Sequence, residues 1–521
     1  MALKPAGKLI IGAALVASFI GGGRYAMQHG MIPTPGIMKA VIPTKTGDLP
    51  HVEDAQVANV PPAAYPSSSP AHVPSILVRG MTWAWLANSG LIYANGGSDT
   101  TVGSLMEKHH VNLKLEHQDD TSLMQAAILN CARELKGGAT QCSNGANFVT
   151  IMGGGTGQFV AAMNAQLKAL GPEYLIKVIG SVGYSRGEDK LMTSPEVKAN
   201  PQLAKGQLWS GVVLDDDYNI ALKWAGDNNI RVNPDETTWD PDAINFVNSQ
   251  TYITAAQDYI AGKCETRKVV ANGSPTGDHK NICVSGVVTW TPGDVDIAEK
   301  KGGLVSTVST REYKSQMPAV VVGPAKFFND HQEEIAQMFA AEFEAADQLK
   351  SYDVALHKAM ALDATFFEGG LDEKYWYTYF KGATKTDAAG LRVSLGGSYV
   401  NDLADNLTLF GMNPGTNDNF RSTYTVFANL ATQLFPERFK VNPIPDVSQV
   451  ENKTFIRAAQ DLMTGSGAAA ETDNFAVAES GPVVSNKSYN ISFDTGKASL
   501  TPEGIRTVTS LKDNLAITGL F

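Results

Sequence analysis

The segment Asn147–Phe159, with the sequence NFVTIMGGGTGQF, constrains the fold of this chain more than any other stretch. Its first half is apolar and β-branched, which predicts a buried strand. A glycine-rich turn, Gly153–Gly157, follows, and apolar residues at helical spacing begin at Phe159. Together they predict a βα unit, whose free N–H groups at the helix start face outward past the end of the strand. The turn either cradles a ligand or is only a tight connection, and the sequence leaves both interpretations open.

The glycines match no nucleotide-binding or hydrolase motif. No Gly-Lys-Ser/Thr follows the turn, and the GxGxxG spacing is absent. The patterns GxSxG and HExxH do not occur either. His109 and His110 are adjacent and point in different directions, so they predict no joint metal site. We therefore predict no catalytic residues, no cofactor and no metal.

Strands of similar character surround this unit. We expect them at Ile76–Val78, Val111–Leu115 and Tyr174–Ile179, with helices between them. Four strands that alternate with helices predict a parallel α/β sheet. A second series of strands and helices, between Leu208 and Ser309, predicts a second α/β region.

The composition limits the partners of this chain. Its 521 residues carry a net charge of −11, and no run of Lys and Arg offsets that charge. A nucleic-acid partner is therefore not expected. The four cysteines form two near pairs, Cys131/Cys142 and Cys264/Cys283, without CxxC spacing. In an exported chain they predict two loop-closing disulfides; the alternative is four free thiols.

The N-terminus indicates export. Lys4 and Lys8 precede the uncharged segment Leu9–Gly23, and Arg24 follows it. This order is typical of an export signal or of an uncleaved anchor in the inner membrane. Residues 31–74 are rich in proline, which predicts an extended tether without a core. The expected location is the periplasm.

Several segments resemble a known family. Thr82–Asn95, the sequence EKHHVNLKLEHQDD, and later VVTWTPGD and MPAVVVG occur in the order seen in type II periplasmic solute-binding proteins of the nitrate/taurine ABC-transporter group. The resemblance covers about residues 75–350 and implies a two-lobed α/β fold. The implied division is a signal or anchor segment (1–30), the tether (31–74), lobe 1 (75–195), lobe 2 (196–310), a return to lobe 1 with a helical extension (311–462), a linker (463–485) and a final domain (486–521).

In such a fold the ligand lies between the strand ends of both lobes, which a hinge brings together. Trp side chains offer apolar walls and an N–H donor, and an arginine can bind an anionic solute. The candidate ligand-binding residues are Trp83, Trp85, Asp120, Gly155, Thr156, Ser185 and Arg186 in lobe 1, and Asp216, Asp217, Thr289 and Trp290 in lobe 2. For Asp215–Asp217, the alternative is a helix start that the carboxylates stabilise.

The final stretch, YNISFDTGKASLTPEG, is similar to the start of an OmpA-like peptidoglycan-binding domain. The acid- and arginine-bearing segment of that family should lie beyond Phe521. The chain is thus expected to be truncated in that domain, and wall binding is not assigned.

The resemblance implies a non-enzymatic binding protein that closes on a small, anionic solute, with an ABC permease as a partner. One alternative is a structural envelope protein that keeps the fold without a ligand. Another is an enzyme similar to the thiamine-pyrimidine precursor synthases.

Overall fold

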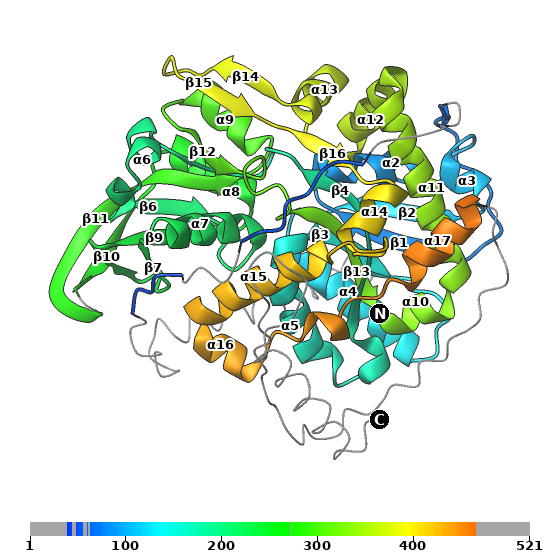
Figure 1. Ribbon diagram of the computed structural model, residues 1–521, viewed down its shortest axis with the longest axis horizontal. Helices are drawn as coiled ribbons and strands as arrows, with labels where there is room; N and C mark the ends of the chain where they lie inside the picture. The colour runs from blue at the N-terminus through cyan, green and yellow to red at the C-terminus, as the bar shows by residue number, and fades with distance from the viewer. Residues whose placement is uncertain (1–38, 44–47, 56–59, 61–62, 272, 465–521) are drawn as a thin grey trace, which may run out of the picture. The chain divides into compact units, whose positions relative to one another are not determined.

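The two predicted α/β regions are both present in the computed structural model, which describes residues 39–43, 48–55, 60, 63–271 and 273–464 (Figure 1). The predicted anchor, the OmpA-like segment and nearly all of the linker lie outside these residues. Within the described part of the chain, no helix is both long and apolar enough to cross a membrane.

The first sheet has six strands in the order β16-β4-β13-β3-β1-β2. Their bounds are β1 (Leu77–Thr82), β2 (Asn112–His117), β3 (Phe148–Met152), β4 (Ile176–Ser185), β13 (Pro318–Pro324) and β16 (Ser398–Val400). The four strands predicted from the sequence, β1 to β4, run parallel, and β13 is inserted antiparallel between β3 and β4. This sheet and its helices form lobe 1.

Several helices of lobe 1 and of the C-terminal extension have a polar side chain that caps their first turn. For example, Asp120 accepts hydrogen bonds from the backbone N–H groups of Ser122 and Leu123. The bounds are α2 (Ser89–Asn95), α3 (Leu105–Lys108), α4 (Thr121–Lys136), α5 (Thr156–Leu167), α10 (Ala325–Asp330), α11 (Gln332–Ser351), α12 (Asp353–Phe366), α13 (Glu373–Lys381), α14 (Leu403–Leu409), α15 (Asn419–Leu434), α16 (Pro436–Val441) and α17 (Thr454–Thr464).

Lobe 2 is built on the second sheet, in the order β12-β5-β11-β6-β9-β7, with β10 and β8 joined to its side. Its strands are β5 (Lys190–Thr193), β6 (Leu208–Gly211), β7 (Arg231–Asn233), β8 (Thr238–Trp239), β9 (Ala243–Asn248), β10 (Cys264–Ala271), β11 (Ser274–Thr289) and β12 (Val305–Ser309). Its helices are α6 (Pro195–Ala199), α7 (Asp216–Asp227), α8 (Tyr252–Ile260) and α9 (Gly293–Lys300).

The chain passes between the lobes several times. It leaves β4 for β5, returns from β12 to β13, and visits lobe 2 again with the hairpin β14 (Ala383–Thr386) and β15 (Arg392–Leu395) before entering β16. The hairpin contacts lobe 2 directly, since the Gly303 N–H donates to Asp387 (2.7 Å). The connection from β4 to β5 and the connection from β15 to β16 are in backbone contact. A Cβ on Gly397 would lie 2.5 Å from the Arg186 carbonyl oxygen. Only glycine fits there.

The described residues of the Pro-rich segment, between 39 and 74, do not form a separate tether. Val41 pairs with Val232 of lobe 2, and Asp54 forms an ion pair with Arg186. The Ala64 N–H donates to the Gln348 side chain of lobe 1 (2.6 Å). We call these residues the N-terminal strap; they lie along the folded unit, in dark blue in Figure 1. The sequence of this segment has no helix or strand pattern, which indicated an extended chain. It could not show that the extended chain packs on the two lobes, because its partners are distant in sequence.

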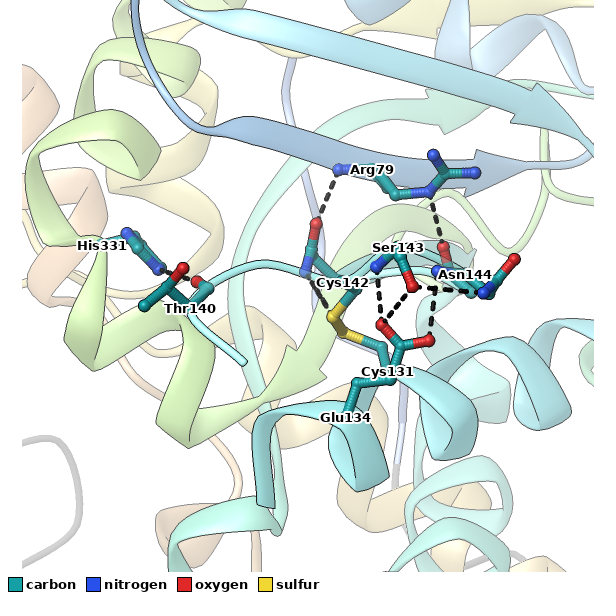
Figure 2. Close-up of a disulfide and its surroundings, with 10 residues drawn as sticks. Arg79, Cys131, Glu134, Thr140, Cys142, Ser143, Asn144 and His331 are labelled. Carbon is teal, nitrogen blue, oxygen red and sulfur yellow. Dashed lines mark hydrogen bonds between the residues drawn. A yellow bond between two sulfur atoms is a disulfide. The ribbon is translucent and has the colours of Figure 1, made fainter. Parts of the chain in front are cut away.

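Both predicted disulfides are confirmed. Cys131, on α4, is bonded to Cys142, and the Asn147 amide donates to both sulfur atoms (3.2 Å each; Figure 2). Cys264 is bonded to Cys283 and joins two facing positions of β10 and β11. Each bridge closes a local loop, as the spacing indicated.

Candidate functional site

A cavity of about 750 Å³ lies where the carboxyl ends of strands from both sheets meet. Lobe 1 contributes the residues after β1, β2 and β3, and lobe 2 contributes those after β6 and β9. Helix α16 adds two side chains, Arg438 and Phe439. The lining residues are Trp83, Asp120, Thr121, Ser122, Leu123, Gln125, Ile151, Met152, Gly155, Gln158, Phe159, Ala162, Val212, Val213, Leu214, Asp215, Asn248, Ser249, Gln250, Arg438 and Phe439.

Three of the predicted site residues line this cavity: Trp83, Asp120 and Gly155. They come from three parallel strands that are neighbours in the sheet, which is why their ends converge. Thr156 is buried behind Gly155 in the first turn of α5. Trp85 is also buried, and its indole N–H donates to the Asp189 carboxylate (3.1 Å).

An aromatic contact joins the two lobes beneath the cavity. The rings of Trp83 and Trp290 have centroids 5.9 Å apart, and Trp290 packs in turn on Tyr252 at 4.2 Å. All three side chains are at most 2% exposed. The two indole N–H groups have no hydrogen-bond partner among the described residues. Buried donors of this kind are rare in folded proteins, and a bound ligand is one way to satisfy them.

The Asp215–Asp217 run is both a helix start and part of the contact between the lobes. Asp215 caps α7 and accepts a hydrogen bond from Thr121 of lobe 1 (3.2 Å). Asp216 packs against the glycine turn, where a Cβ at Gly154 would clash with its carboxylate. The space beside Gly154 is therefore filled by a side chain of lobe 2, whereas Gly155 of the same turn lines the cavity.

Asp217 and Asp189 are both fully buried and face each other across the lobes. Burial, followed by repulsion from the neighbouring carboxylates, raises the pKa of Asp217 well above its usual range. Burial also raises the pKa of Asp189, to about 6. No Lys, Arg or His of the described chain forms an ion pair with either group, and burial of the two neighbouring carboxyls favours the protonated form of Asp217.

The structure does not bring Arg186 to the cavity, and this corrects the expected convergence of its strand end with the others. Strand β4 runs on to Ser185 and is separated from β3 by β13, so Arg186 lies at the crossing between the lobes. Its guanidinium binds Asp54 (2.9 Å) and stacks on Tyr184.

Ser185 and Thr289 are also buried away from the cavity. The Ser185 hydroxyl lies 2.6 Å from that of Thr310. The Thr289 hydroxyl donates to the Tyr252 carbonyl oxygen (3.0 Å). Both groups hold neighbouring backbone segments together.

Sequence reasoning missed several residues that join the lobes at the cavity. The Gln250 amide donates to Asp120 (3.1 Å), and the Gln158 amide donates to Asn219 (3.1 Å). Gln250 follows β9, a strand that we did not predict, and Arg438 comes from a helix almost 300 residues beyond the glycine turn. These contacts show that the lobes are closed on each other.

The Gln250→Ala variant is expected to shift the chain toward a more open arrangement. One hydrogen bond between the lobes is worth about 1 kcal/mol, which is about a fivefold change in the ratio of open to closed molecules. Small-angle X-ray scattering should show a larger mean radius of gyration. Gln202→Ala is the matched control, because the Gln202 amide bonds Asn228 within lobe 2; equal radii for both variants would contradict the expectation.

Comparison with known proteins supports no family assignment. No protein-family profile and no curated protein matches the chain. Among solved structures it is similar to the periplasmic aliphatic sulphonate binding protein SsuA from Escherichia coli, at 12% identity and a TM-score of 0.42, over 72% of this chain and 91% of that one. It is also similar to the periplasmic nitrate-binding protein NrtA from Synechocystis PCC 6803, at 8% identity and a TM-score of 0.40, over 74% of this chain and 93% of that one. A third similar structure is the desulfurization enzyme DSZB, at 11% identity and a TM-score of 0.41, over 74% of this chain and 99% of that one. These similarities identify no ligand and no activity.

Proposed function

We propose that this chain is an exported, envelope-associated binding protein whose two lobes close on a small solute in the 750 Å³ cavity. The observation that carries the proposal is the position of the cavity, at the carboxyl ends of strands from both sheets. Open α/β sheets bind ligands at this edge. The proposal assigns no reaction to the site.

The lining supports recognition through hydrogen bonds. The described side chains around the cavity include four amides, three hydroxyls and two carboxylates, beside the apolar faces of Trp83 and Phe159. A few polar groups on an apolar wall fix the orientation of a small ligand. A solute that touches both lobes binds the closed arrangement better than the open one, and its binding free energy therefore favours closure.

A solute screen tests the proposal. The full chain is heated with each member of a library of amines, polyols, carboxylates and sulfonates, and a true ligand must raise the melting temperature. If no member does so, and calorimetry detects no binding, the proposed function is wrong.

The Trp83→Phe variant is expected to bind such a ligand about fivefold more weakly, since one hydrogen bond is worth about 1 kcal/mol. The substitution keeps most of the packing and removes the unpartnered indole N–H at the cavity. Trp376→Phe is the matched control, because Trp376 is also buried with an unpartnered N–H and lies outside the cavity. Calorimetric titration should separate the two variants; equal affinities would remove Trp83 from the site.

A further inference from the structure

We propose that the solute carries a protonated amine, which the carboxylates of Asp120 and Asp215 hold between the two lobes. This inference rests on the proposed function and names its class of ligand. It replaces the anionic solute that the resemblance implied.

Asp120 and Asp215 line the cavity from opposite lobes in the same manner. Each uses one oxygen to cap its own helix: Asp120 accepts from the Ser122 N–H (2.8 Å), and Asp215 from the Asp216 N–H (2.9 Å). The second oxygen of each accepts a hydrogen bond from a neutral side chain of the other lobe: Asp120 from the Gln250 amide (3.1 Å), and Asp215 from the Thr121 hydroxyl (3.2 Å). No ion pair with either residue occurs in the described part of the chain. A carboxylate oxygen can accept a further hydrogen bond, so both are free to bind a charged donor.

Trp83 is an independent indication of a ligand here. It lines the cavity, is only 1% exposed, and has an indole N–H without a partner. The face of an indole ring attracts a cation, and its N–H donates to an acceptor. The buried Tyr252 hydroxyl lies beside the Asp215 carboxylate. The site therefore suits a solute with both an amine and an oxygen or nitrogen acceptor.

Charge behind the cavity wall favours a cation. Asp189, Asp216 and Asp217 are fully buried and have no ion-pair partner among the described residues. The nearby Lys190 is already paired with Asp294. Charges in a poorly solvated interior act over longer distances than charges in water. An anionic solute would meet these carboxyl groups with Arg438 as the single positively charged side chain among the described lining residues.

The cavity lining has the same sign of charge. It contains two carboxylates, Asp120 and Asp215, and one guanidinium, Arg438, which gives a formal charge of −2 + 1 = −1. Arg438 is an exposed residue. No group of three or more potential metal ligands occurs in the described chain. The size of the cavity and its amide groups also suit an organic molecule better than a metal ion.

Binding of a cation should release protons. Burial raises the pKa of Asp215, Asp216 and Asp217 and so favours their protonated forms in the free protein. A bound cation stabilises the ionised forms, and its affinity therefore rises with pH. The groups that face the cluster are Asp189, Glu188 and Lys190 at the crossing, Tyr252 on α8 and Asp294 on α9. An anionic solute would show the opposite dependence on pH.

The test uses three probes of similar size: cyclohexylamine, cyclohexanol and cyclohexanecarboxylate, followed by the wider library in the same three charge classes. Melting temperature and calorimetric affinity of the full chain are measured at pH 5.5 and pH 8.0. Only amines are expected to bind, and more tightly at pH 8.0. Asp215→Asn should weaken binding by about 10- to 100-fold, the effect of losing a hydrogen bond to a charged group.

Asn is a good N-cap residue, so the variant should fold. Asp278→Asn is the matched control: Asp278 lies on an exposed part of β11 outside the cavity, and its substitution should leave binding unchanged.

The outcomes separate the two proposals. Binding of carboxylates, sulfonates or neutral polyols in preference to amines would overturn the inference and leave the binding function standing. Amine binding that Asp215→Asn and Asp120→Asn both leave unchanged would also overturn it. If no class of solute binds, the proposed function fails and the inference fails with it.

Discussion

The Lys190→Met variant is expected to lose about 3–5 kcal/mol of unfolding free energy, because it leaves a buried carboxylate without its cation. The side chains of Lys190 and Asp294 are 1% and 0% exposed and form an ion pair. Lys190 also donates to the Ser394 carbonyl oxygen (3.1 Å), and Asp294 accepts from the Gly396 N–H (3.0 Å). The pair therefore ties β5 and α9 to the last crossing between the lobes.

Urea denaturation checks this value. The double variant Lys190→Met/Asp294→Leu should recover part of the loss, since it removes both buried charges together. Lys300→Met is the control for an exposed pair: Lys300 binds Asp296 on the same helix, and its side chain is 52% exposed. Surface pairs contribute at most about 1 kcal/mol. If Lys190→Met costs no more than this control, the buried pair does not have the assigned role.

The unfolding free energy of the Asp363→Asn variant is expected to fall less between pH 5 and pH 8 than that of the parent protein. Asp363 is fully buried and accepts a hydrogen bond from the Ser89 hydroxyl (2.6 Å), which also lies 2.7 Å from the Leu86 carbonyl oxygen. Burial raises the pKa of this carboxyl by more than the hydrogen bond from Ser89 lowers it, so Asp363 is a neutral acid in the folded protein at pH 5.

The direction of the effect follows from the two states of the group. Burial raises the pKa of Asp363 to about 8 in the folded chain, whereas an unfolded aspartic acid titrates near 3.9. Between these values the unfolded chain has lost the proton and the folded chain keeps it. The unfolding free energy therefore falls as the pH rises, by up to about 1.4 kcal/mol per pH unit from this group.

Denaturation curves at pH 5 and pH 8 for the parent and the variant isolate this contribution. The asparagine side-chain oxygen can still accept the hydrogen bond from Ser89 and the amide cannot ionise, so the parent should lose about 3–4 kcal/mol more than the variant over three pH units. Other buried acids contribute equally to both chains and cancel in the difference. Parallel curves would show that Asp363 is ionised in the folded protein, and Asp278→Asn should give curves parallel to those of the parent.

The sequence allowed the parallel core and part of the site to be predicted, because both depend on local patterns. Strands β1, β2 and β3 are short segments with apolar residues in succession or in alternation, and neighbouring parallel strands end at one edge. Trp83, Asp120 and Gly155 could therefore be placed together. Arg186 could not be placed, because its position depends on β13, a strand more than 130 residues away that enters the sheet between β3 and β4.

Other features required knowledge of how the lobes touch. The neighbouring sequence does not distinguish a glycine that leaves space for a ligand from Gly154, which leaves space for the carboxylate of Asp216. The same holds for Gln250 and Arg438, whose roles at the cavity arise from strands and helices that pack far from them in sequence. Local patterns predict elements, and only the tertiary structure shows which side chains meet.

The position of Asp54 has a consequence for the opening of the lobes. This residue of the N-terminal strap binds Arg186 at the first crossing (2.9 Å) and Lys314 at the second (3.1 Å). A rotation that separates Arg186 from Lys314 must break one of these ion pairs. The strap therefore holds the two crossings together. The Asp54 side chain is 35% exposed, and salt should weaken its attraction. The ease with which the cleft opens is thereby coupled to the ionic strength outside the molecule.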